Sequence, residues 1–260
     1  MTKSPALYRV ILLVWAALFG LALLTTAGSL SREITQRPVA GVLALVTLLS
    51  IGYFWLNGIK DVLYTAWYYL VMRGRIRPVR RRELHRHPPR VVMVYCTRND
   101  FNANSLAASM KQRYTNVHTV ILDDSDKPEY LTMIDIFAAT HDVQVVRREN
   151  HVGFKAGNLN NYLTGADYDY FVILDSDEII PPRFICRMLD YFASDQSIGI
   201  VQATHVATRN VTRFQQKFSL GVDSHWPVYQ SMKNRYGFLS LLGHGAMVSR
   251  LIRIQGVVEV

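Results

Sequence analysis

The stretch ILDSDEIIPP, Ile173 to Pro182, puts acidic residues at the end of an apolar run. The run Tyr170 to Leu174 is rich in β-branched and aromatic residues, which is typical of a buried strand. Asp175 and Asp177 follow it at once, and the closing prolines predict that a helix opens there. The question is why a chain would place two carboxylates, one residue apart, where a buried strand ends.

Similar apolar runs recur after Pro88-Pro89, and segments of helical length separate the first four of them. The runs are Val91 to Cys96, Val117 to Leu122, Val143 to Val146, Tyr170 to Leu174 and Ile198 to Ala203. This alternation predicts βαβ units, and therefore an α/β fold with a mainly parallel sheet and helices on both faces. Ligands of such sheets bind beyond the carboxyl ends of the strands.

Polar segments follow the strand ends, where packing alone does not explain them. They are Thr97-Arg98-Asn99-Asp100, Asp123-Asp124-Ser125-Asp126, the stretch HVGFKAGNLN from His151 to Asn160, and Asp175-Ser176-Asp177. Neither a Walker P-loop nor G-x-G-x-x-G occurs, so the usual signatures for ATP and for dinucleotides are missing.

Asp175 and Asp177 can converge on one site, because positions i and i+2 of a strand share a face. Two close carboxylates repel each other unless a cation lies between them. Mg²⁺ or Mn²⁺, held by these carboxylates and by substrate phosphates, meets that need. The alternative is a helix-entry turn in which Ser176 or Asp177 caps the following helix.

Two other segments suggest contacts to a nucleotide. Lys155 to Asn160 reads as a small polar loop entering a helix, and a lysine beside a helix N-terminus suits a diphosphate. An acid in the stretch Asp123 to Ser125 could accept a hydrogen bond from the imide N–H of a uracil ring. The alternatives are an ordinary loop with a solvated lysine, and an Asx-type turn at Asp123 to Ser125.

The N-terminal part of the chain predicts two transmembrane helices. No charged residue occurs from Val10 to Ser31 or from Val39 to Ile59, and a span needs ~20 mostly apolar residues. The first run is long for a secretory signal, so we expect it to be retained. The aromatic-rich segment Asn57 to Met72 predicts an interfacial helix, with a continuation of the second span as the alternative. Residues 1–72 would form this membrane region.

A basic block at residues 73–90 follows the second span. Eight arginines and one acid, Glu83, lie in it, and the whole chain carries a net charge of +9. The positive-inside rule then places the block, and the N-terminus, in the cytoplasm. Attraction to anionic lipids is expected. We expect no nucleic-acid partner, because the block contains no aromatic residues for base stacking. The two cysteines, Cys96 and Cys186, have no metal spacing and predict ordinary thiols.

The order and content of these motifs resemble inverting family-two glycosyltransferases with the GT-A fold. The similarity is closer to their membrane-embedded, cellulose-synthase-like branch. The segments that carry it are Thr97 to Asp100, Asp123 to Ser125, Lys155 to Asn160, Asp175 to Asp177 and Gly243 to Arg250. The resemblance covers residues 91–260, which would form the glycosyltransferase domain.

The resemblance implies a role for each of these segments. Asp175 and Asp177 would hold Mg²⁺ or Mn²⁺ on the diphosphate of a UDP-sugar, with Asp177 as the direct ligand and Asp175 also near the sugar. The other donor-binding residues would be Thr97, Asp100 and Asp124 around uridine, and Lys155 and Asn158 along the diphosphate. The implied enzyme is a multi-pass protein of the inner (plasma) membrane that transfers a sugar, glucose being the usual one, to a polysaccharide or glucan.

The chain departs from that family in its C-terminal part. The family takes its general base from a Glu-Asp pair shortly after the last of these segments, and no such pair follows Arg250. We therefore expect the base beyond Val260, in a longer protein of which this chain is the donor-binding part. The alternatives are a non-processive transferase acting on a lipid carrier, and a nucleotide-sugar sensor or subunit. A hydrolase is disfavoured, because glycosidase carboxylates need ~5–9.5 Å between them.

Overall fold

The computed structural model describes residues 6–74, 79, 88–207, 212–236 and 241–251. Most of the basic block at 73–90 and the terminal stretch Gly256 to Val260 lie outside the described residues. The chain divides into two compact units. The sheet unit comprises residues 78–204 and 241–260, and the helical unit comprises residues 1–77 and 205–240. The sequence places 91–260 in one domain, whereas the contacts group 205–240 with the N-terminal helices.

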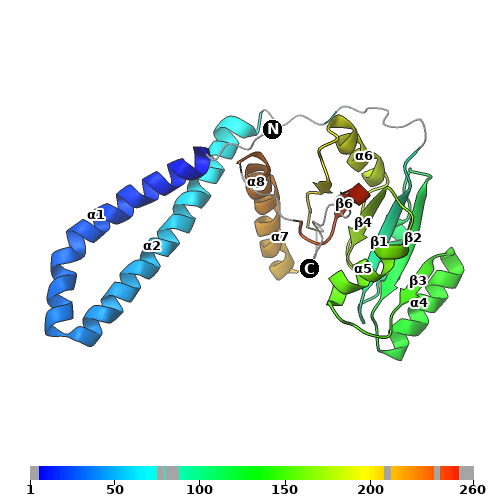
Figure 1. Cartoon of the computed structure of the whole chain (residues 1–260), viewed down its shortest axis with the longest axis horizontal. Coiled ribbons are helices and arrows are strands. Elements are labelled where there is room, and N and C mark those ends of the chain that lie inside the picture. The colour runs from blue at the N-terminus through cyan, green and yellow to red at the C-terminus, as the bar shows by residue number, and fades with distance from the viewer. Residues whose placement is uncertain (1–5, 75–78, 80–87, 208–211, 237–240, 252–260) are drawn as a thin grey trace. The chain divides into compact units, whose positions relative to one another are not determined.

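The sheet unit is built on a six-stranded sheet with the order β3-β2-β1-β4-β6-β5 (Figure 1). Its strands are β1 (Val91–Thr97), β2 (Val117–Asp123), β3 (Gln144–Arg147), β4 (Tyr170–Leu174), β5 (Ile200–Gln202) and β6 (Ala246–Ser249). Neighbours among β3, β2, β1 and β4 pair in parallel. Strand β6 runs antiparallel to both β4 and β5. The predicted α/β architecture with a mainly parallel sheet is confirmed.

Helices cover both faces of this sheet, and strand β1 shows why. Its odd-numbered residues Val91, Met93 and Tyr95 join one apolar core, and Val92 and Val94 join the other. Successive side chains of a strand point to opposite faces, so a strand buried on both sides reads as a continuous apolar run. The first core is completed by α3 (Ala103–Ser109), α4 (Pro128–His141) and α6 (Phe184–Ser194), and the second by α5 (Phe154–Gly165).

Two local expectations differ from the structure. The segment Lys155 to Asn160 is not a loop, because it lies within the first turns of α5. Strand β6 was expected only as part of the motif Gly243 to Arg250. It was not recognised as a strand, because its four residues follow two glycines in which φ is positive.

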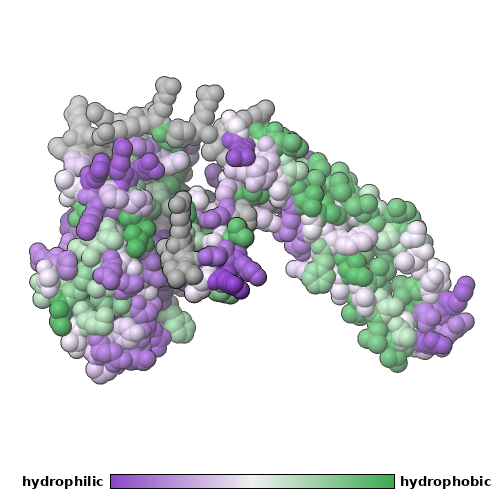
Figure 2. Space-filling model, turned by 180° about the vertical axis from the view of Figure 1, so that it is seen from behind, coloured by the Kyte–Doolittle hydropathy of each residue, from purple (hydrophilic) through white to green (hydrophobic). Residues whose placement is uncertain are grey.

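The helical unit contains two long apolar helices, α1 (Ala6–Gln36) and α2 (Pro38–Trp67), and α2 continues into the π-helix η1 (Tyr68–Met72). Both are long and apolar enough to cross a membrane, and only 11% of the most apolar window of each is buried. Figure 2 shows hydrophobic residues over this hairpin. Residues 57–72 continue the second helix without a break, through the end of α2 and η1.

Glycine allows the two helices to pack closely. A Cβ atom at Gly52 would lie 2.6 Å from the ring of Phe19, and the indole N–H of Trp15 donates to the Gly52 carbonyl at 2.7 Å. The unit is completed by α7 (Arg213–His225), the π-helix η2 (Trp226–Gln230) and α8 (Ser231–Tyr236).

Candidate nucleotide-sugar site

A cavity of about 630 Å³ opens at the carboxyl ends of β1, β2 and β4. It contains every site residue that the sequence predicts: Thr97, Asp100, Asp124, Lys155, Asn158, Asp175 and Asp177. The parallel strands explain this gathering, because their carboxyl ends meet at the same edge of the sheet. A second cavity, of about 430 Å³, is lined by residues at the other ends of the strands, such as Arg90 and His118, and contains none of the predicted residues.

Asp100 connects the ends of β1 and β4. One of its carboxylate oxygens accepts hydrogen bonds from the Thr97 hydroxyl at 2.7 Å and from the Arg98 backbone N–H at 2.8 Å. The other accepts from the Ser176 hydroxyl at 2.7 Å. Both oxygens therefore shape the cavity floor, and the Thr97 hydroxyl is already donating inside the protein.

Asp124 has a bidentate ion pair with Arg148. The guanidinium donates from Nε to Oδ1 at 2.9 Å and from Nη2 to Oδ2 at 2.6 Å. The Asn158 amide donates to Oδ1 at 2.9 Å, and His151 Nδ1 lies 3.3 Å from the same oxygen. Although burial alone would raise it, Arg148 and His151 bring the pKa of Asp124 below its usual value. In this state both oxygens of Asp124 are engaged by the protein.

The Asx-turn alternative holds for the neighbouring residue. The Asp123 carboxylate accepts the Ser125 backbone N–H at 2.9 Å, and its other oxygen accepts from Arg147 at 2.7 Å. Asp123 is therefore a structural residue, whereas Asp124 lines the cavity.

The start of α5 is fixed by close backbone packing. A Cβ atom on Gly157 would lie 2.0 Å from the Val152 carbonyl oxygen, so only glycine fits there. Arg148 donates to the carbonyls of Val152 and Phe154 at 2.7 and 2.8 Å. Gly157 thus serves packing within the chain, and together with Arg148 it presents Lys155 and Asn158 to the cavity.

Lys155 forms an ion pair with the carboxylate of Asp175. Its ammonium group donates to Asp175 Oδ1 and, at 2.7 Å, to the carbonyl of Gly243. Both charged side chains are about one-third exposed, at 35% and 39%. Lys155 therefore neutralises one of the two acids and ties the segment before β6 to the cavity.

Asp177 is exposed and lines the same cavity. Among the residues that the structure describes, none donates to its carboxylate. The predicted alternative of a helix cap does not hold, because α6 begins at Phe184 with Arg183 as its N-cap and has no side-chain cap. The oxygen atoms at hand, two carboxylates and the Gly243 carbonyl, are the ligand type that Mg²⁺ and Mn²⁺ prefer. These residues therefore fit a hard divalent cation.

Asn158 offers a different kind of group. It is 2% exposed, its amide nitrogen is used by Asp124, and its Oδ1 has no hydrogen-bond partner. A buried acceptor without a partner is costly. As oriented here, Asn158 suits an N–H or O–H donor of a ligand better than the oxygens of a diphosphate.

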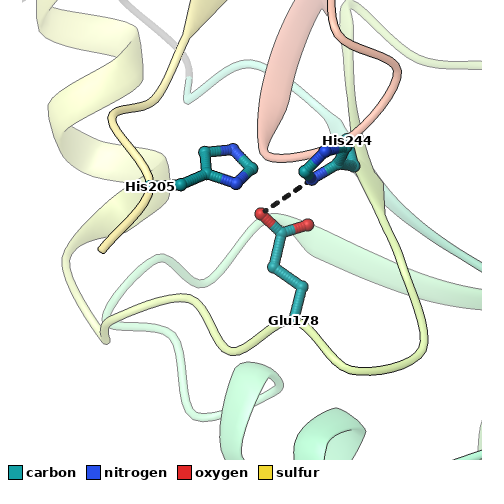
Figure 3. A group of neighbouring side chains, drawn as sticks. All are labelled: Glu178, His205 and His244. Atoms are coloured by element: carbon teal, nitrogen blue, oxygen red, sulfur yellow. Dashed lines mark ion pairs between the residues drawn. The ribbon is translucent and has the colours of Figure 1, made fainter. Parts of the chain in front are cut away.

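The loop Leu241 to Gly245 directly precedes β6 in the sequence. It contacts Lys155 through the Gly243 carbonyl and Glu178 through His244. Figure 3 shows His244 of this loop in an ion pair with Glu178, with His244 Nδ1 3.7 Å from Glu178 Oε1. His205, also drawn there, belongs to the helical unit. Burial raises the pKa of Glu178, and the nearby imidazole opposes the rise.

Gln202, at the end of β5, holds this loop with its whole side-chain amide. Its nitrogen donates to the carbonyls of His244 and Gly245 at 2.8 and 3.2 Å. Its oxygen accepts the Leu242 backbone N–H at 3.2 Å. The loop in turn presents the Gly243 carbonyl to Lys155. Gln202 therefore fixes one wall of the site without facing the ligand space.

We expect Gln202→Leu, which keeps the side-chain size, to loosen this loop. Three hydrogen bonds of about 0.5–1.5 kcal/mol each are removed, so loop amides should exchange hydrogen at least roughly 10-fold faster. Exchange of the β1 amides should stay unchanged. Gln144→Leu, at an exposed edge position on β3, is the matched control. Unaltered exchange over Leu241 to Gly245 would show that Gln202 does not hold the loop.

Sequence reasoning missed Arg148, Gln202 and the Glu178–His244 pair. Arg148 directly follows β3 and Gln202 ends β5, so the strand-end rule could have found both. Cys96 also lines the cavity. Burial raises the pKa of its thiol to about 12, which keeps it protonated and unreactive at neutral pH.

The chain is similar to known proteins both in sequence and in structure. The sequence model of the family described as "Glycosyl transferase family 2" matches residues 90–252. The chain is 29% identical over 119 residues to the glucans biosynthesis glucosyltransferase H of Cereibacter sphaeroides, covering 44% of this chain and 19% of that protein. It is also 29% identical over 85 residues to the cellulose synthase catalytic subunit [UDP-forming] of Pseudomonas fluorescens, covering 33% and 11%. The chain thus spans less than a fifth of these relatives.

One solved structure shows the similarity in structure. The mannosyltransferase PcManGT from Pyrobaculum calidifontis, solved with GDP-Man and Mn²⁺, superposes with a TM-score of 0.54 at 19% identity. The match covers 74% of this chain and 53% of that one. At this identity the likeness concerns the fold, which is the GT-A-like α/β fold that the sequence predicts.

Proposed function

The chain belongs to glycosyl transferase family 2, and on this premise we propose that it is the donor-binding part of a membrane glycosyltransferase. It would transfer a sugar, with glucose as the expected one, from a UDP-sugar to a growing polysaccharide or glucan with inversion. The observation that carries the proposal is the cavity in which Thr97, Asp100, Asp124, Lys155, Asn158, Asp175 and Asp177 meet.

Each part of the cavity suits one part of such a donor. Asp124 Oδ2, which accepts from Arg148 and as a carboxylate oxygen can accept a second hydrogen bond, and the unpartnered oxygen of Asn158 offer acceptors to the N–H groups and hydroxyls of a nucleoside. Lys155, in the first turn of α5, offers an ammonium group and a helix N-terminus to phosphate oxygens. The pairing of Lys155 with Asp175 would loosen as that ammonium turns to the phosphates.

Asp175 and Asp177 would hold Mg²⁺ or Mn²⁺. When bound, the ion neutralises charge on the departing nucleoside diphosphate. Asp177 is the stronger candidate for a direct ligand, because Asp175 is already paired with Lys155. A general base for the acceptor hydroxyl is not assigned among the described residues.

The choice of UDP and of glucose rests on the relatives. One is named a glucosyltransferase of glucan biosynthesis, and the other is named UDP-forming. The structural neighbour was solved with GDP-Man, so the nucleotide is a testable choice. The acceptor would be the polysaccharide end or a lipid-linked sugar.

The proposed location is the inner (plasma) membrane, with α1 and α2 as two spans and the sheet unit in the cytoplasm. Two apolar helices with little buried surface support it. The arginine-rich residues 73–90 would be a cytoplasmic linker close to anionic lipid. In this arrangement, residues 1–72 anchor the protein and residues 91–260 bind the donor.

The test is titration calorimetry of the purified chain in detergent with UDP, GDP and UDP-glucose, each with Mn²⁺, with Mg²⁺ and with EDTA. We expect UDP to bind about tenfold more tightly than GDP, a difference of about 1.4 kcal/mol, and to need the metal. Tighter GDP binding would overturn the choice of nucleotide. No metal-dependent binding of either nucleotide would overturn the donor site.

A further inference from the structure

Helix α7 exposes a row of apolar side chains. Phe214 and Phe218 lie one turn apart, are 76% and 63% exposed, and stack with ring centroids 6.0 Å apart. Val222 continues the row, because residues four apart share one helix face. Two neighbouring phenylalanines that remain exposed are unusual for the surface of a soluble domain and mark an interaction surface.

The same helix carries positive charge beside that row. Arg213 and Lys217, also one turn apart, each directly precede one of the phenylalanines in sequence and flank them along the helix. From Thr212 to Tyr236 the chain contains four basic residues, Arg213, Lys217, Lys233 and Arg235, and one acid, Asp223. Aromatic residues on one face of a helix, with lysine and arginine at its flank, are typical of a helix that lies in the surface of an anionic membrane.

The helical unit also connects α7, through η2 and α8, to the ends of the two apolar helices. Helix α7 runs without a break into η2 and α8. Val228 and Met232 of these elements are buried in one cluster with Leu7 of α1 and Tyr64 of α2. In addition, Trp67 donates to the Tyr236 hydroxyl at 2.8 Å. Leu7 and Tyr64 lie near the start of α1 and the end of α2, which form the same end of the hairpin.

We propose that α7 is an interfacial helix that lays its Phe214–Phe218–Val222 face into the headgroup region of an anionic lipid bilayer. Arg213 and Lys217 would then lie against lipid phosphates. The inference rests on the proposed membrane location, because the end of the hairpin is the level of the headgroups only if α1 and α2 span the bilayer. The tyrosines and tryptophans packed there suit that level.

The basic residues of α7, and its continuation into η2 and α8, indicate that a lipid bilayer covers its apolar face. A protein partner would also cover the phenylalanines, but it would not account for a basic flank on a helix that continues into the elements packed at the ends of the two apolar helices. A bilayer with anionic lipid matches both features at once. It would also cover this face in every molecule that is inserted in the membrane.

The test places nitroxide labels on the full chain in nanodiscs of phosphatidylcholine and phosphatidylglycerol. Single cysteines are introduced as Phe218→Cys on the apolar face and Gln216→Cys on the polar face, after Cys96→Ala and Cys186→Ala. Frequent collision of the label with O₂ shows that the label lies in lipid, and frequent collision with a water-soluble nickel chelate shows that it lies in water. We expect the ratio of O₂ to nickel collisions to be several-fold higher at position 218 than at 216.

Leu24→Cys, in the middle of α1 and 80% exposed, calibrates the membrane placement. A water signal at 24 would overturn the proposed membrane location itself. A lipid signal at 24 with water at 218 would overturn the docking of α7 alone. Protection of position 218 from both reagents would mean that protein covers the face, which also overturns it. UDP binding of the unaltered chain, measured in discs of the same lipids, reports the donor site separately.

The basic flank has its own prediction in this experiment. Lys217→Gln should lower the ratio at position 218 in discs with phosphatidylglycerol and leave it unchanged in discs of phosphatidylcholine alone. An equal effect in both lipids would show that the lysine does not contact anionic headgroups.

Discussion

Asp177→Ala is expected to weaken the binding of UDP in Mn²⁺ or Mg²⁺ by about 100-fold or more, roughly 2.7 kcal/mol. The Asp177 carboxylate is exposed, lines the cavity and accepts no hydrogen bond from the described side chains, so a cation is the partner that its position suits. Its removal should leave the fold intact, because none of the described residues of the sheet unit donates a hydrogen bond to it. Calorimetry with and without EDTA measures the loss.

The matched control is Glu129→Ala. Glu129 is an exposed carboxylate in the first turn of α4, outside the cavity. It removes the same charge from the same unit, so it accounts for any general electrostatic effect on nucleotide affinity. Equal UDP affinity in Asp177→Ala and in the unaltered chain would remove Asp177 from the metal site. The UDP affinity of Asp177→Asn should fall between the affinities of Asp177→Ala and of the unaltered chain, since an amide oxygen is a weaker ligand for a hard cation.

The sheet was largely predictable because β1 and β4 are continuous apolar runs that are almost wholly buried, and because β2 and β3 contain valine and isoleucine pairs. The predicted Tyr170 to Leu174 is strand β4 with the same ends, and β1 and β2 each extend one residue further than expected. Short strands gave less signal: β5 is half the predicted length, and β6 was not identified as a strand. The flanking glycines of β6 adopt positive φ, which a sequence pattern for strands does not anticipate.

The location of the candidate site was predictable for a topological reason. Parallel strands bring their carboxyl ends together, so residues that follow different strands meet even when they are far apart in sequence. The pairing of side chains within the site was not predictable. Arg148 meets Asp124 across 24 positions, and Gln202 meets the loop of His244 across 42. Such contacts depend on strand register and on rotamers, which no local pattern specifies.

Arg148→Met is expected to give the largest loss of stability in the sheet unit, about 3 kcal/mol. The side chains of Arg148 and Asp124 are both 8% exposed, so the change leaves a buried carboxylate without its cation. It also removes the hydrogen bonds to the carbonyls of Val152 and Phe154 at the start of α5. Hydrogen exchange of the β1 and β4 amides, which reports the opening of this unit, should be accelerated by about 100-fold.

Two comparisons separate the lost ion pair from lost packing. Arg90→Met removes an arginine whose pairing with Asp167 is exposed, and it should cost less than about 1 kcal/mol. Asp124→Asn together with Arg148→Met removes the buried charge itself and should recover part of the stability lost in Arg148→Met. A double variant no more stable than Arg148→Met would mean that the loss comes from the packing of Arg148.

The pH dependence follows from the lowered pKa of Asp124. In the unaltered chain this carboxylate contributes stability above its unfolded pKa of about 3.9, and the contribution is lost as the pH falls through the lower folded value. In Arg148→Met, burial without the guanidinium should raise the pKa of Asp124 instead. Protonation of Asp124 would then relieve the buried charge on acidification. The stability gap between variant and parent should therefore be smaller at pH 5 than at pH 7, and a gap that does not change with pH would contradict the assignment of the loss to Asp124.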